Sequence, residues 1–581
     1  MKLGILATLP LLFACANSKV TPVQNQLQGQ NPIQLELVAR HISGQYGEGA
    51  AEVVAYQATQ QKLYVVNGAA KAIDIVSIKQ IPQQALALPY SGQNLASTRL
   101  SLPNTAETAA GQLTLKSPNS LAIHGDLMAV AMQNKDKQAN GAILFYDLSA
   151  QQPSLIKAVE VGALPDMVAF TPDGSKVVVA NEGEPSKDYR NDPEGSISII
   201  ETGLVTGNGI SQQDIRLNFQ SFNSKMLELK QSGVKFASPK GTSVAQDLEP
   251  EYVAISADST TAYVTLQENN AIAIVDLTKP AISSVKGLGY KDWNQYTIDV
   301  SDKDGAQLNR YENLYGLYQP DTIYSYQVNG KTYLLTANEG DAREYIYDAN
   351  EADCKAAGHK FDDEDGCISY SEEVRAKKLS FKSPSIIDSY YDKNGIGRLK
   401  VTKVLGDDDG DGYHEKLYAY GARSFSIWDS EANQVFDSGD HIAKTLLQTY
   451  GEQFNANESK NNGDNRSDDK GAEPEALTVA KIGNRYYGFI GLERMGGIMV
   501  YDITNPQQPQ YLNFINNRDM SLEFKIDDDT DPVTLKGNYD KVGDLAPEGM
   551  VFISAEQSPT GKPLLAVANE VSGSLSIYQI R

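Results

Sequence analysis

A repeated unit of short β-rich segments constrains the fold of this chain more than any other feature. Each copy begins with a Pro-acid or similar pair and continues through an alternating apolar strand, a turn and a second β-rich strand that ends in Ala-Asn-Glu or a variant. A third strand, ending in Asp, follows after a loop. Turns such as Asn329-Gly330 between two apolar runs are typical of antiparallel hairpins. The strong copies are residues 165–199, 249–277, 320–339, 473–503 and 547–580.

Weaker copies extend the count of repeats. They occupy residues 51–78 and 118–148, and the stretch LYAYGARSFSIWD at 417–429 resembles the last two strands of an eighth unit. The first strand of that unit would be the apolar run near Leu399 to Leu405. Repeated short antiparallel sheets, with no helical periodicity between them, are typical of a β-propeller. We therefore predict an all-β propeller of about seven blades, or eight, with long inserted loops; two tandem β-sandwiches are the alternative.

The inserted loops follow from the length of the chain. A plain blade takes roughly 40–50 residues, and this chain of 581 residues spends far more on each. We expect insertions at about 201–245, 281–318, 345–398, 432–470 and 505–545, where loops on one face would build a binding surface. A strand from Ile33 to Arg40 is expected to close the ring beside Ser574 to Ile580, so that residues 33–581 form a single propeller domain.

The first residues read as an export signal. A basic Met1–Lys2 precedes the apolar run Leu3 to Leu12, which is too short to remain as a membrane span, and Leu12-Phe13-Ala14-Cys15 resembles a bacterial lipobox. This predicts a lipoprotein signal peptide over 1–14, a lipid on Cys15 and a flexible tether over 15–32. The alternative is an ordinary signal peptide. The expected location is that of an exported lipoprotein: the outer membrane, periplasm or cell surface.

Charge excludes one class of partner. The chain carries 51 Lys and Arg against 74 Asp and Glu, a formal net charge of -23. This balance argues against nucleic acid or an anionic membrane face as a direct partner. It suits cation binding, or simply solubility. We expect a monomer that meets the membrane only through the lipid on Cys15.

Acidic residues recur at two positions of the repeat. One precedes the first strand and the other follows the second strand, and these positions lie at the same end of an antiparallel hairpin. Around a propeller they would converge on one channel mouth, where carboxylates repel each other unless cations or donors compensate. The alternative is that each acid ties neighbouring blades through backbone N–H groups. The expected acidic rim is Asp166, Glu182, Glu251, Glu268, Asp321, Glu339, Glu475, Glu493, Glu548 and Glu570.

Three arginines follow repeat strands closely. They could neutralise the rim or hold an oxyanion. If the protein is an enzyme, the candidate catalytic residues are Glu339, Arg343, Arg423, Glu493 and Arg494.

A separate acidic loop, DDDGDGYHE at 407–415, resembles the first half of a calcium loop. The twelfth position is Tyr418 rather than Glu and a strand follows, so the loop is no EF-hand. We predict a compact calcium site there, against the alternative of a solvated acidic turn. The predicted ligands are Asp407, Asp409, Asp411, the Tyr413 carbonyl and Glu415.

Cysteine and histidine limit the remaining chemistry. Cys354 and Cys367 flank a polar loop and are expected to form a disulfide in an oxidising compartment. The 5 histidines have no zinc spacing, and the sequence has neither a G-x-S-x-G elbow nor a P-loop. Serine-triad and nucleotide-cradle chemistry are therefore disfavoured.

Several long motifs resemble one family along nearly all the chain after the signal. They include AQDLEPEYVAISADSTTAYVTLQENNAIAIVDL, YLLTANEGDARE, DDDGDG with LYAYGARSFSIWD, RSDDKGAEPEAL, and DLAPEGMVFI with SPTGKPLLAVANEVSGSLSIYQI. In this order they resemble the choice-of-anchor I family of extracellular bacterial proteins. The resemblance implies a β-propeller and, since members are often labelled alkaline phosphatase-like, a hydrolase activity.

Two main functions are consistent with these features. One is a metal-dependent phosphoester hydrolase, with calcium or another divalent ion on the acidic rim and a small phosphoester as substrate. The other is a non-catalytic, calcium-stabilised surface module that binds a small ligand, polysaccharide or protein. Hydrolysis of a lactone or another ester by a calcium-centred propeller is a third. The sequence leaves the substrate, the rim metal and the membrane leaflet open.

Overall fold

The computed structural model describes residues 33–363, 366–381, 392–528 and 530–581. The predicted signal peptide at 1–14, the lipid site Cys15 and the tether at 15–32 lie outside the described residues. In the part of the chain that is described, no helix combines the length and apolar character needed to cross a membrane.

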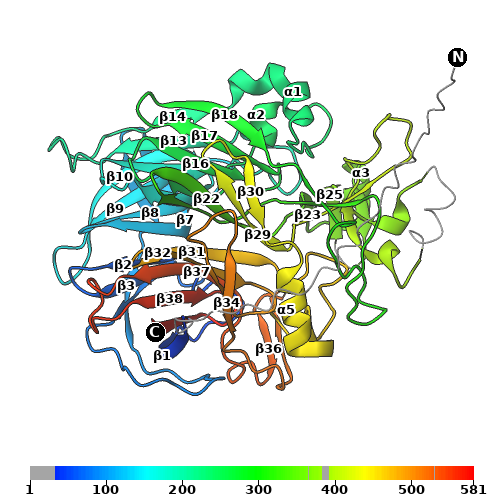
Figure 1. Cartoon of the computed structure of the whole chain (residues 1–581). Coiled ribbons are helices and arrows are strands. Elements are labelled where there is room, and N and C mark those ends of the chain that lie inside the picture. The colour runs from blue at the N-terminus through cyan, green and yellow to red at the C-terminus, as the bar shows by residue number, and fades with distance from the viewer. Residues whose placement is uncertain (1–32, 364–365, 382–391, 529) are drawn as a thin grey trace, which may run out of the picture.

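Antiparallel meanders of four or five strands make up most of the structure (Figure 1). The described residues form seven of them, each named here by its place in this order. The first three are β2(Val54–Gln57), β3(Lys62–Asn67), β4(Ala72–Ser77), β5(Ser97–Ser101); β6(Thr105–Thr108), β7(Gly111–His124), β8(Leu127–Asn134), β9(Asn140–Asp147), β10(Ser154–Ala163); and β11(Pro165–Phe170), β12(Lys176–Asn181), β13(Ser196–Glu201), β14(Ile215–Asn218). The other four are β15(Val253–Ile255), β16(Thr261–Leu266), β17(Ala271–Asp276), β18(Ala281–Gly287); β21(Ile323–Val328), β22(Lys331–Asn338), β29(Ser424–Asp429), β30(Gln434–Asp437); β31(Pro474–Ile482), β32(Arg485–Leu492), β33(Ile498–Asp502), β34(Gln510–Ile515); and β37(Pro547–Ile553), β38(Leu564–Asn569), β39(Ser574–Ile580), β1(Leu35–Ile42).

The central strands of each meander are buried on both faces. β12 (KVVVAN) and β17 (AIAIVD) read as nearly continuous apolar runs because each sheet is stacked between two others. The side chains of Val178 and Ala180 in the third sheet pack against Ala262 and Val264 in the fourth. The same arrangement joins the last sheet to the first, so the hydrophobic cores lie between sheets.

The first strands of six meanders, together with β7 of the second meander, contact one another in cyclic order. β2 contacts β7, and the series continues through β11, β15, β21 and β31 to β37, which contacts β2 again. The last meander is completed by the N-terminal strand, because β1 pairs antiparallel with β39 from Leu35↔Ile580 to Ile42↔Ser574. The sequence predicted that these two strands are neighbours, but it placed the N-terminal strand two residues earlier, at Ile33 to Arg40. The chain is thus all-β, with a propeller-like arrangement of sheets.

The predicted eighth unit is wrong. Its strand β29 is the third strand of the fifth sheet, where Asn338 of β22 pairs with Ser424 across a separation of 86 residues. The other strand, β28 (Leu417–Ala419), belongs to a separate sheet made by the insertions. The large insertion between β22 and β29 split one repeat into two pieces, which made the second piece look like a unit of its own.

The five large insertions leave the sheets at a common end. They follow either the second or the fourth strand of a meander, and both strands run towards the same end in this topology. Figure 1 shows α3, β23, β25 and α5 together on one side of the sheets. The inserted strands are β19(Tyr290–Asp292), β20(Leu314–Leu317), β23(Glu344–Tyr347), β24(Lys360–Asp362), β25(Gly366–Ser371), β26(Glu373–Arg375), β27(Lys400–Thr402), β28, β35(Phe524–Asp527) and β36(Thr534–Gly537). The helices are η1(Gln220–Lys225), α1(Met226–Gln231), α2(Val244–Asp247), α3(Glu351–Ala356), η2(Ala376–Lys378), η3(Ile396–Arg398), α5(His441–Tyr450) and η4(Gly451–Gln453).

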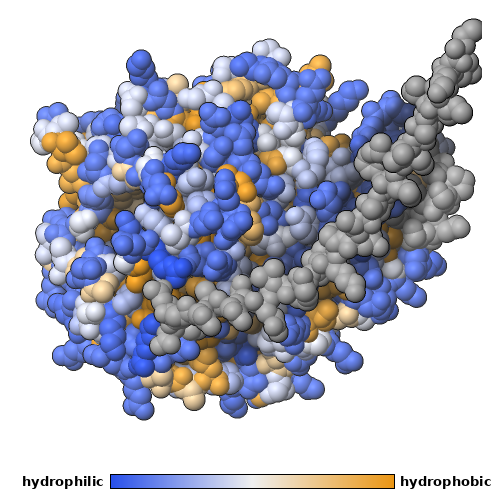
Figure 2. Space-filling view, in the orientation of Figure 1, coloured by the Kyte–Doolittle hydropathy of each residue, from blue (hydrophilic) through white to orange (hydrophobic). Residues whose placement is uncertain are grey.

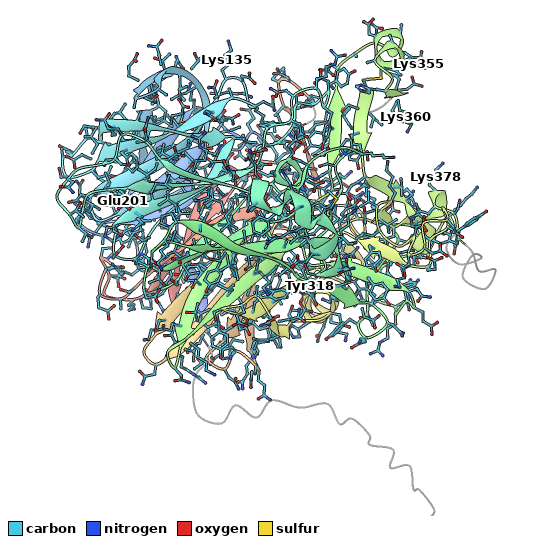
Figure 3. The ribbon with its side chains drawn as sticks, turned by 90° about the horizontal axis from the view of Figure 1, so that it is seen from above. Lys135, Glu201, Tyr318, Lys355, Lys360 and Lys378 are labelled. Atoms are coloured by element: carbon cyan, nitrogen blue, oxygen red, sulfur yellow. A yellow bond between two sulfur atoms is a disulfide. The ribbon has the colours of Figure 1, made fainter. Side chains whose placement is uncertain are left out.

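The face of the protein seen in Figure 2 is mainly hydrophilic. Figure 2 shows polar side chains over most of the visible face, with apolar ones in small scattered areas, as the net charge leads one to expect. Seen from above, the segment with Lys355 and Lys360 projects beyond the sheets (Figure 3).

Candidate functional site

The acids of the repeat lie at the same end of the sheets as the large insertions. The start of each first strand pairs with the end of the second, as in Pro165↔Asn181 and Pro474↔Leu492. An acid follows each of these positions. The backbone that leads into the first strand also repeats, because the residue before its proline has a positive φ in four sheets. These residues are Leu164 (φ 48), Gln319 (φ 42), Glu473 (φ 51) and Ala546 (φ 57).

A cavity of about 310 Å³ opens among these acids. We call this cavity, together with the acids that interact electrostatically with its lining, the acidic mouth. Glu339 and Glu475 interact in this way with Asp321 and Glu548, and Glu249 and Glu268 interact with Glu182. Residues from the first, second, third, fourth, fifth and seventh sheets line the cavity. Five of the ten predicted rim acids are among them: Asp166, Glu182, Asp321, Glu548 and Glu570. The acidic and basic lining residues are Glu52, Lys137, Asp166, Glu182, Asp321, Glu548 and Glu570.

The mouth continues into an apolar passage between the first strands. Two further cavities, of about 350 and 400 Å³, share Met167 and Tyr252 with the acidic mouth. Their walls carry apolar side chains such as Phe170, Ile255 and Val551. The space between the sheets is therefore acidic at the end where the insertions lie and apolar beyond Met167 and Tyr252.

Burial raises the pKa values of the acids, and for most of them neighbouring carboxylates add to the effect. Burial raises the pKa of Asp166 to about 6. Burial, together with the neighbouring Glu339, raises the pKa of Asp321 to about 8. Burial and then Glu548 raise the pKa of Glu475 well above its usual range. Without a bound cation, the mouth thus favours protonated carboxyl groups. Burial first, and neighbouring carboxylates after it, act in the same direction on the pKa values of Glu52, Glu182, Glu251 and Glu548.

Glu339, Glu475 and Glu493 form a compact group, which we call the β21–β31 group after the sheets that it joins. One oxygen of each lies within 4.8 Å of the others. The two oxygens of Glu339 accept from Lys470 Nζ at 2.6 Å and from Gln267 Nε2 at 2.8 Å. Among the described residues, the buried Oε2 atoms of Glu475 and Glu493 have no hydrogen-bond partner. Carboxylate oxygens in this arrangement are suitable ligands for a hard divalent cation.

A second group contains Glu182, Glu249 and Glu268, again with one oxygen of each within 4.8 Å of the others. It joins the third and fourth sheets. Glu249 was not predicted, although it is the first glutamate of Glu249-Pro250-Glu251, which Glu473-Pro474-Glu475 repeats. The repeated Glu-Pro-Glu was the signal that could have identified both Glu249 and Glu473.

Glu473 lies at the centre of a buried ion-pair cluster. Its carboxylate contacts Arg466 Nη2 at 2.7 Å, Lys470 Nζ at 2.9 Å and Arg494 Nε at 3.0 Å. Burial on its own would raise the pKa of Glu473, but the cations of Arg466, Arg494 and Lys470 hold it well below its usual range. Arg466 and Lys470 belong to an insertion, so the sequence pattern of the repeat gave no signal for them.

Two of the predicted arginines are not available to hold a substrate oxyanion. Arg343 is 0 % exposed and donates to Glu249 and to the carbonyl of Asp247. The guanidinium of Arg423 donates to three backbone carbonyls. Both arginines fasten the bases of insertions, because guanidinium groups satisfy several buried acceptors at once. Arg494 differs, since its side chain stays 21 % exposed beside Glu493 at 3.0 Å.

Two further residues of the mouth were missed. Glu52 occupies the position before the first strand in the weak copy at 51–78, where only its place in the repeat could have identified it. Lys137 follows β8 and pairs with Glu184 at 2.9 Å. It offers the mouth a positive charge whose side chain is 45 % exposed.

The acidic loop lies apart from these groups and is held by its own backbone. Asp407 accepts from the amides of Gly410 and Gly412, at 2.8 and 2.9 Å. One oxygen each of Asp407, Asp409 and Glu415 lies within 4.8 Å of the others, whereas Asp411 accepts from the amide of Tyr413. The structure thus brings together three of the four predicted carboxylate ligands.

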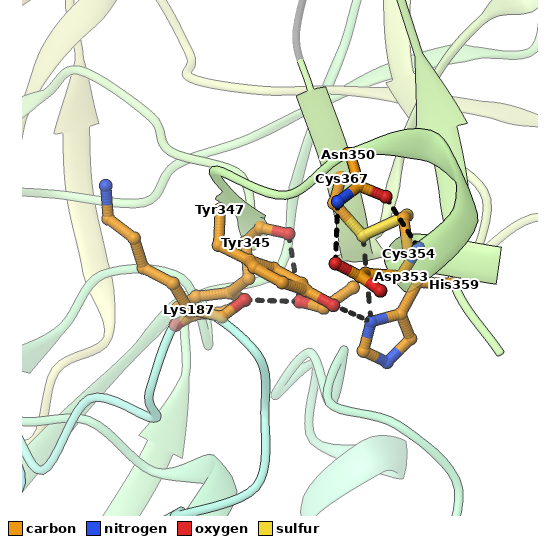
Figure 4. Close-up of a disulfide and its surroundings, with 9 residues drawn as sticks. Lys187, Tyr345, Tyr347, Asn350, Asp353, Cys354, His359 and Cys367 are labelled. Carbon is orange, nitrogen blue, oxygen red and sulfur yellow. Dashed lines mark hydrogen bonds between the residues drawn. A yellow bond between two sulfur atoms is a disulfide. The ribbon is translucent and has the colours of Figure 1, made fainter. Parts of the chain in front are cut away.

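Cys354 and Cys367 are joined in a disulfide, as their spacing predicts (Figure 4). The bond links α3 to β25 in the projecting insertion. His359 accepts or donates at 2.9 Å with Tyr347 and lies against Cys367 Sγ. The disulfide therefore stabilises a lobe outside the acidic mouth.

Comparison with known proteins gives distant relatives and one family. The chain is 33% identical to Gigasin-3a of Magallana gigas over 192 residues, which are 32% of this chain and 65% of that protein. It is 25% identical to the mesenchyme-specific cell surface glycoprotein of Strongylocentrotus purpuratus over 318 residues, which are 50% of this chain and 40% of that protein. The matches thus span less than two thirds of either relative.

One solved structure is the β-propeller domain of Cps50 (Swd1) from Myceliophteria thermophila. It shows 8% identity and a TM-score of 0.40, over 94% of this chain and 100% of that one. This similarity is too low to support an argument, so the fold rests on the sheets of this chain. The model of the choice-of-anchor I domain matches residues 52–506, which contain the first five meanders and three of the four strands of the sixth. Domains of this kind are typical of extracellular or surface-associated proteins. With most of its length matched, this chain belongs to the choice-of-anchor I domain family.

Proposed function

We propose that this protein is an extracellular binding module, built as a closed seven-bladed propeller, whose acidic mouth binds a divalent cation. The cation would complete the recognition surface that the large insertions form around the mouth. Calcium is the expected ion, because the described ligands are carboxylate oxygens and the groups contain neither His nor Cys. A second calcium ion is expected in the loop of Asp407, where it would stabilise the loop.

The observation that carries the proposal is the β21–β31 group. Glu493, whose side chain is 8 % exposed, has one oxygen against Arg494 and another, Oε2, without a hydrogen-bond partner among the described residues. Burying a carboxylate oxygen without a partner costs about 1–3 kcal/mol. A cation shared with Glu339 and Glu475 would remove this cost and the mutual repulsion of the three carboxylates.

A second candidate is metal-dependent phosphoester hydrolysis. Arg494 and Lys137 favour it, because they are partly exposed cations near the acids and could contact phosphate oxygens. We rank it second because the guanidinium groups of Arg343 and Arg423 donate to carbonyls within the protein and do not face a substrate. Hydrolysis would then depend on the metal ion to activate water.

Calcium titration of the purified protein tests the proposal. Isothermal titration calorimetry should show calcium binding that Glu493→Gln weakens at least tenfold, since the variant replaces a charged ligand. Asp409→Asn should remove a different ion, the one in the loop. Glu452→Gln, which changes an exposed glutamate outside the mouth, is the matched control. Binding that is identical in wild type and Glu493→Gln would contradict the proposed rim ion.

A phosphatase panel separates the two candidates. With p-nitrophenyl phosphate and calcium, magnesium, manganese or zinc, a binding module is expected to be inert. Turnover that a chelator abolishes, and that Glu493→Gln reduces, would favour the hydrolase instead.

The anchor at Cys15 remains a proposal from the sequence. A lipid there would carry the protein into the membrane fraction and add acyl chains to the mature N-terminus. We expect Cys15→Ala to move the protein to the soluble fraction and to abolish the mass of the lipid in mass spectrometry. An unchanged distribution between the two fractions would contradict it.

A further inference from the structure

We propose that Glu182, Glu249 and Glu268 form a second calcium site in the acidic mouth, at the junction of the third and fourth sheets. The site differs from the β21–β31 group in its residues, its sheets and its surroundings. Calcium binding at this site therefore does not depend on an ion at the β21–β31 group.

Glu249 is the residue on which the site is built. Its side chain is 1 % exposed, and Oε1 accepts from Arg343 Nη1. Oε2 is buried and has no hydrogen-bond partner among the described residues. A fully buried carboxylate with one oxygen held and the other unsatisfied is costly, unless a cation or a proton occupies the second oxygen.

The contacts around Glu249 fix its position before any ion binds. Its backbone N–H donates to Asn269 Oδ1 at 3.3 Å. Arg343 also donates to the carbonyl of Asp247 at 2.7 Å, and the Arg343 amide donates to Glu372 at 3.0 Å. The site therefore sits against a buried network that joins two insertions to the fourth sheet, and little reorganisation is needed on binding.

The spacing of the oxygens suits calcium. Calcium–oxygen distances of 2.3–2.6 Å place oxygens on opposite sides of the ion roughly 4.6–5.2 Å apart, and adjacent ones closer. The oxygens of Glu182, Glu249 and Glu268 all lie within 4.8 Å of one another. Magnesium keeps several of its waters and usually binds one or two protein carboxylates, so a group of three carboxylates favours calcium.

Two of the three ligands are not fully enclosed. Glu182 and Glu268 are only partly buried, and Glu182 lines the cavity. An ion on Glu249 would thus keep room for water or for an anionic group of a ligand. Calcium with 6–8 oxygen ligands commonly includes such groups.

Anomalous scattering gives a direct test on the full-length protein. Crystals grown with calcium, or soaked in terbium as a calcium substitute, should show an anomalous peak between the three carboxylates. In solution, Glu268→Gln should lower the number of bound calcium ions by one or weaken one binding step at least tenfold. Glu452→Gln makes the same charge change at an exposed position outside the mouth and should bind as the wild type does.

The positions of the anomalous peaks show whether this site, the β21–β31 group, or both bind calcium. A peak at Glu182, Glu249 and Glu268 that survives Glu493→Gln supports this site whether or not the β21–β31 group is occupied. A peak at the β21–β31 group alone overturns this site and leaves the proposed function standing. Absence of any peak in the acidic mouth overturns both. The anomalous peaks are measured on the wild-type protein and on Glu493→Gln. The site can therefore be tested even if Glu268→Gln does not fold.

Discussion

Replacing Glu473 with Gln is expected to destabilise the protein by about 3–5 kcal/mol, the typical cost of breaking a buried ion pair by removing one partner. Glu473 is 0 % exposed and contacts Arg466, Lys470 and Arg494. Glutamine preserves the size of the side chain but leaves these three cations without their shared counter-charge. Urea denaturation at pH 7, followed by intrinsic fluorescence, measures the change in the free energy of unfolding.

A control and the pH dependence make this prediction specific. Glu452→Gln, at an exposed position in η4, should change stability by less than about 0.5 kcal/mol. Because the folded pKa of Glu473 lies below its unfolded value, its stabilisation is present at pH 7 and is lost as pH falls below about 4. The difference between wild type and Glu473→Gln should therefore shrink in acid. A Glu473→Gln variant as stable as wild type at pH 7 would show that the cluster contributes no net stability.

Much of the fold could be predicted because its information is local. A hairpin such as β11–β12 combines an alternating apolar strand, a Pro-Asp-Gly turn and a second strand within 17 residues, from Pro165 to Asn181. The ends of these strands must meet, so acids at those positions had to converge. The pairing of β1 with β39 was also accessible, since a lone N-terminal strand needs an edge.

The rest could not be predicted because it depends on contacts across insertions. Ser424 pairs with Asn338 only after the chain between them has folded outside the sheet, and no local pattern marks this. Lys470 reaches Glu339 from an insertion that has no repeat periodicity. Arg423 looked like a member of the rim by its place after a strand, but its guanidinium binds carbonyls at the base of the insertions. Residue type alone cannot tell these roles apart.

Rising pH is expected to destabilise the protein when divalent cations are removed. The folded pKa values of Asp166 and Asp321, about 6 and about 8, lie above the value near 4 of an unfolded aspartate. Between pH 5 and 8 the folded protein thus holds protons that the unfolded chain has released. Linkage then makes the free energy of unfolding fall as pH rises, by about 1 kcal/mol per pH unit for each retained proton after allowance for screening in the mouth.

Calcium should reverse this dependence, because an ion in the acidic mouth replaces the protons that its carboxylates would otherwise hold. Urea denaturation in EDTA should show stability decreasing from pH 5.5 to 8, and the same series with excess calcium should be flatter and higher at pH 8. Asp321→Asn removes a titrating group with a raised pKa and should reduce the slope in EDTA, whereas Asp258→Asn, in an exposed turn, should leave the slope unchanged. Stability that rises with pH in EDTA would mean that the acids of the mouth are already compensated by Lys137, Lys470 and Arg494. The sign of this slope therefore tells whether the acidic mouth needs a cation in order to remain charged at neutral pH.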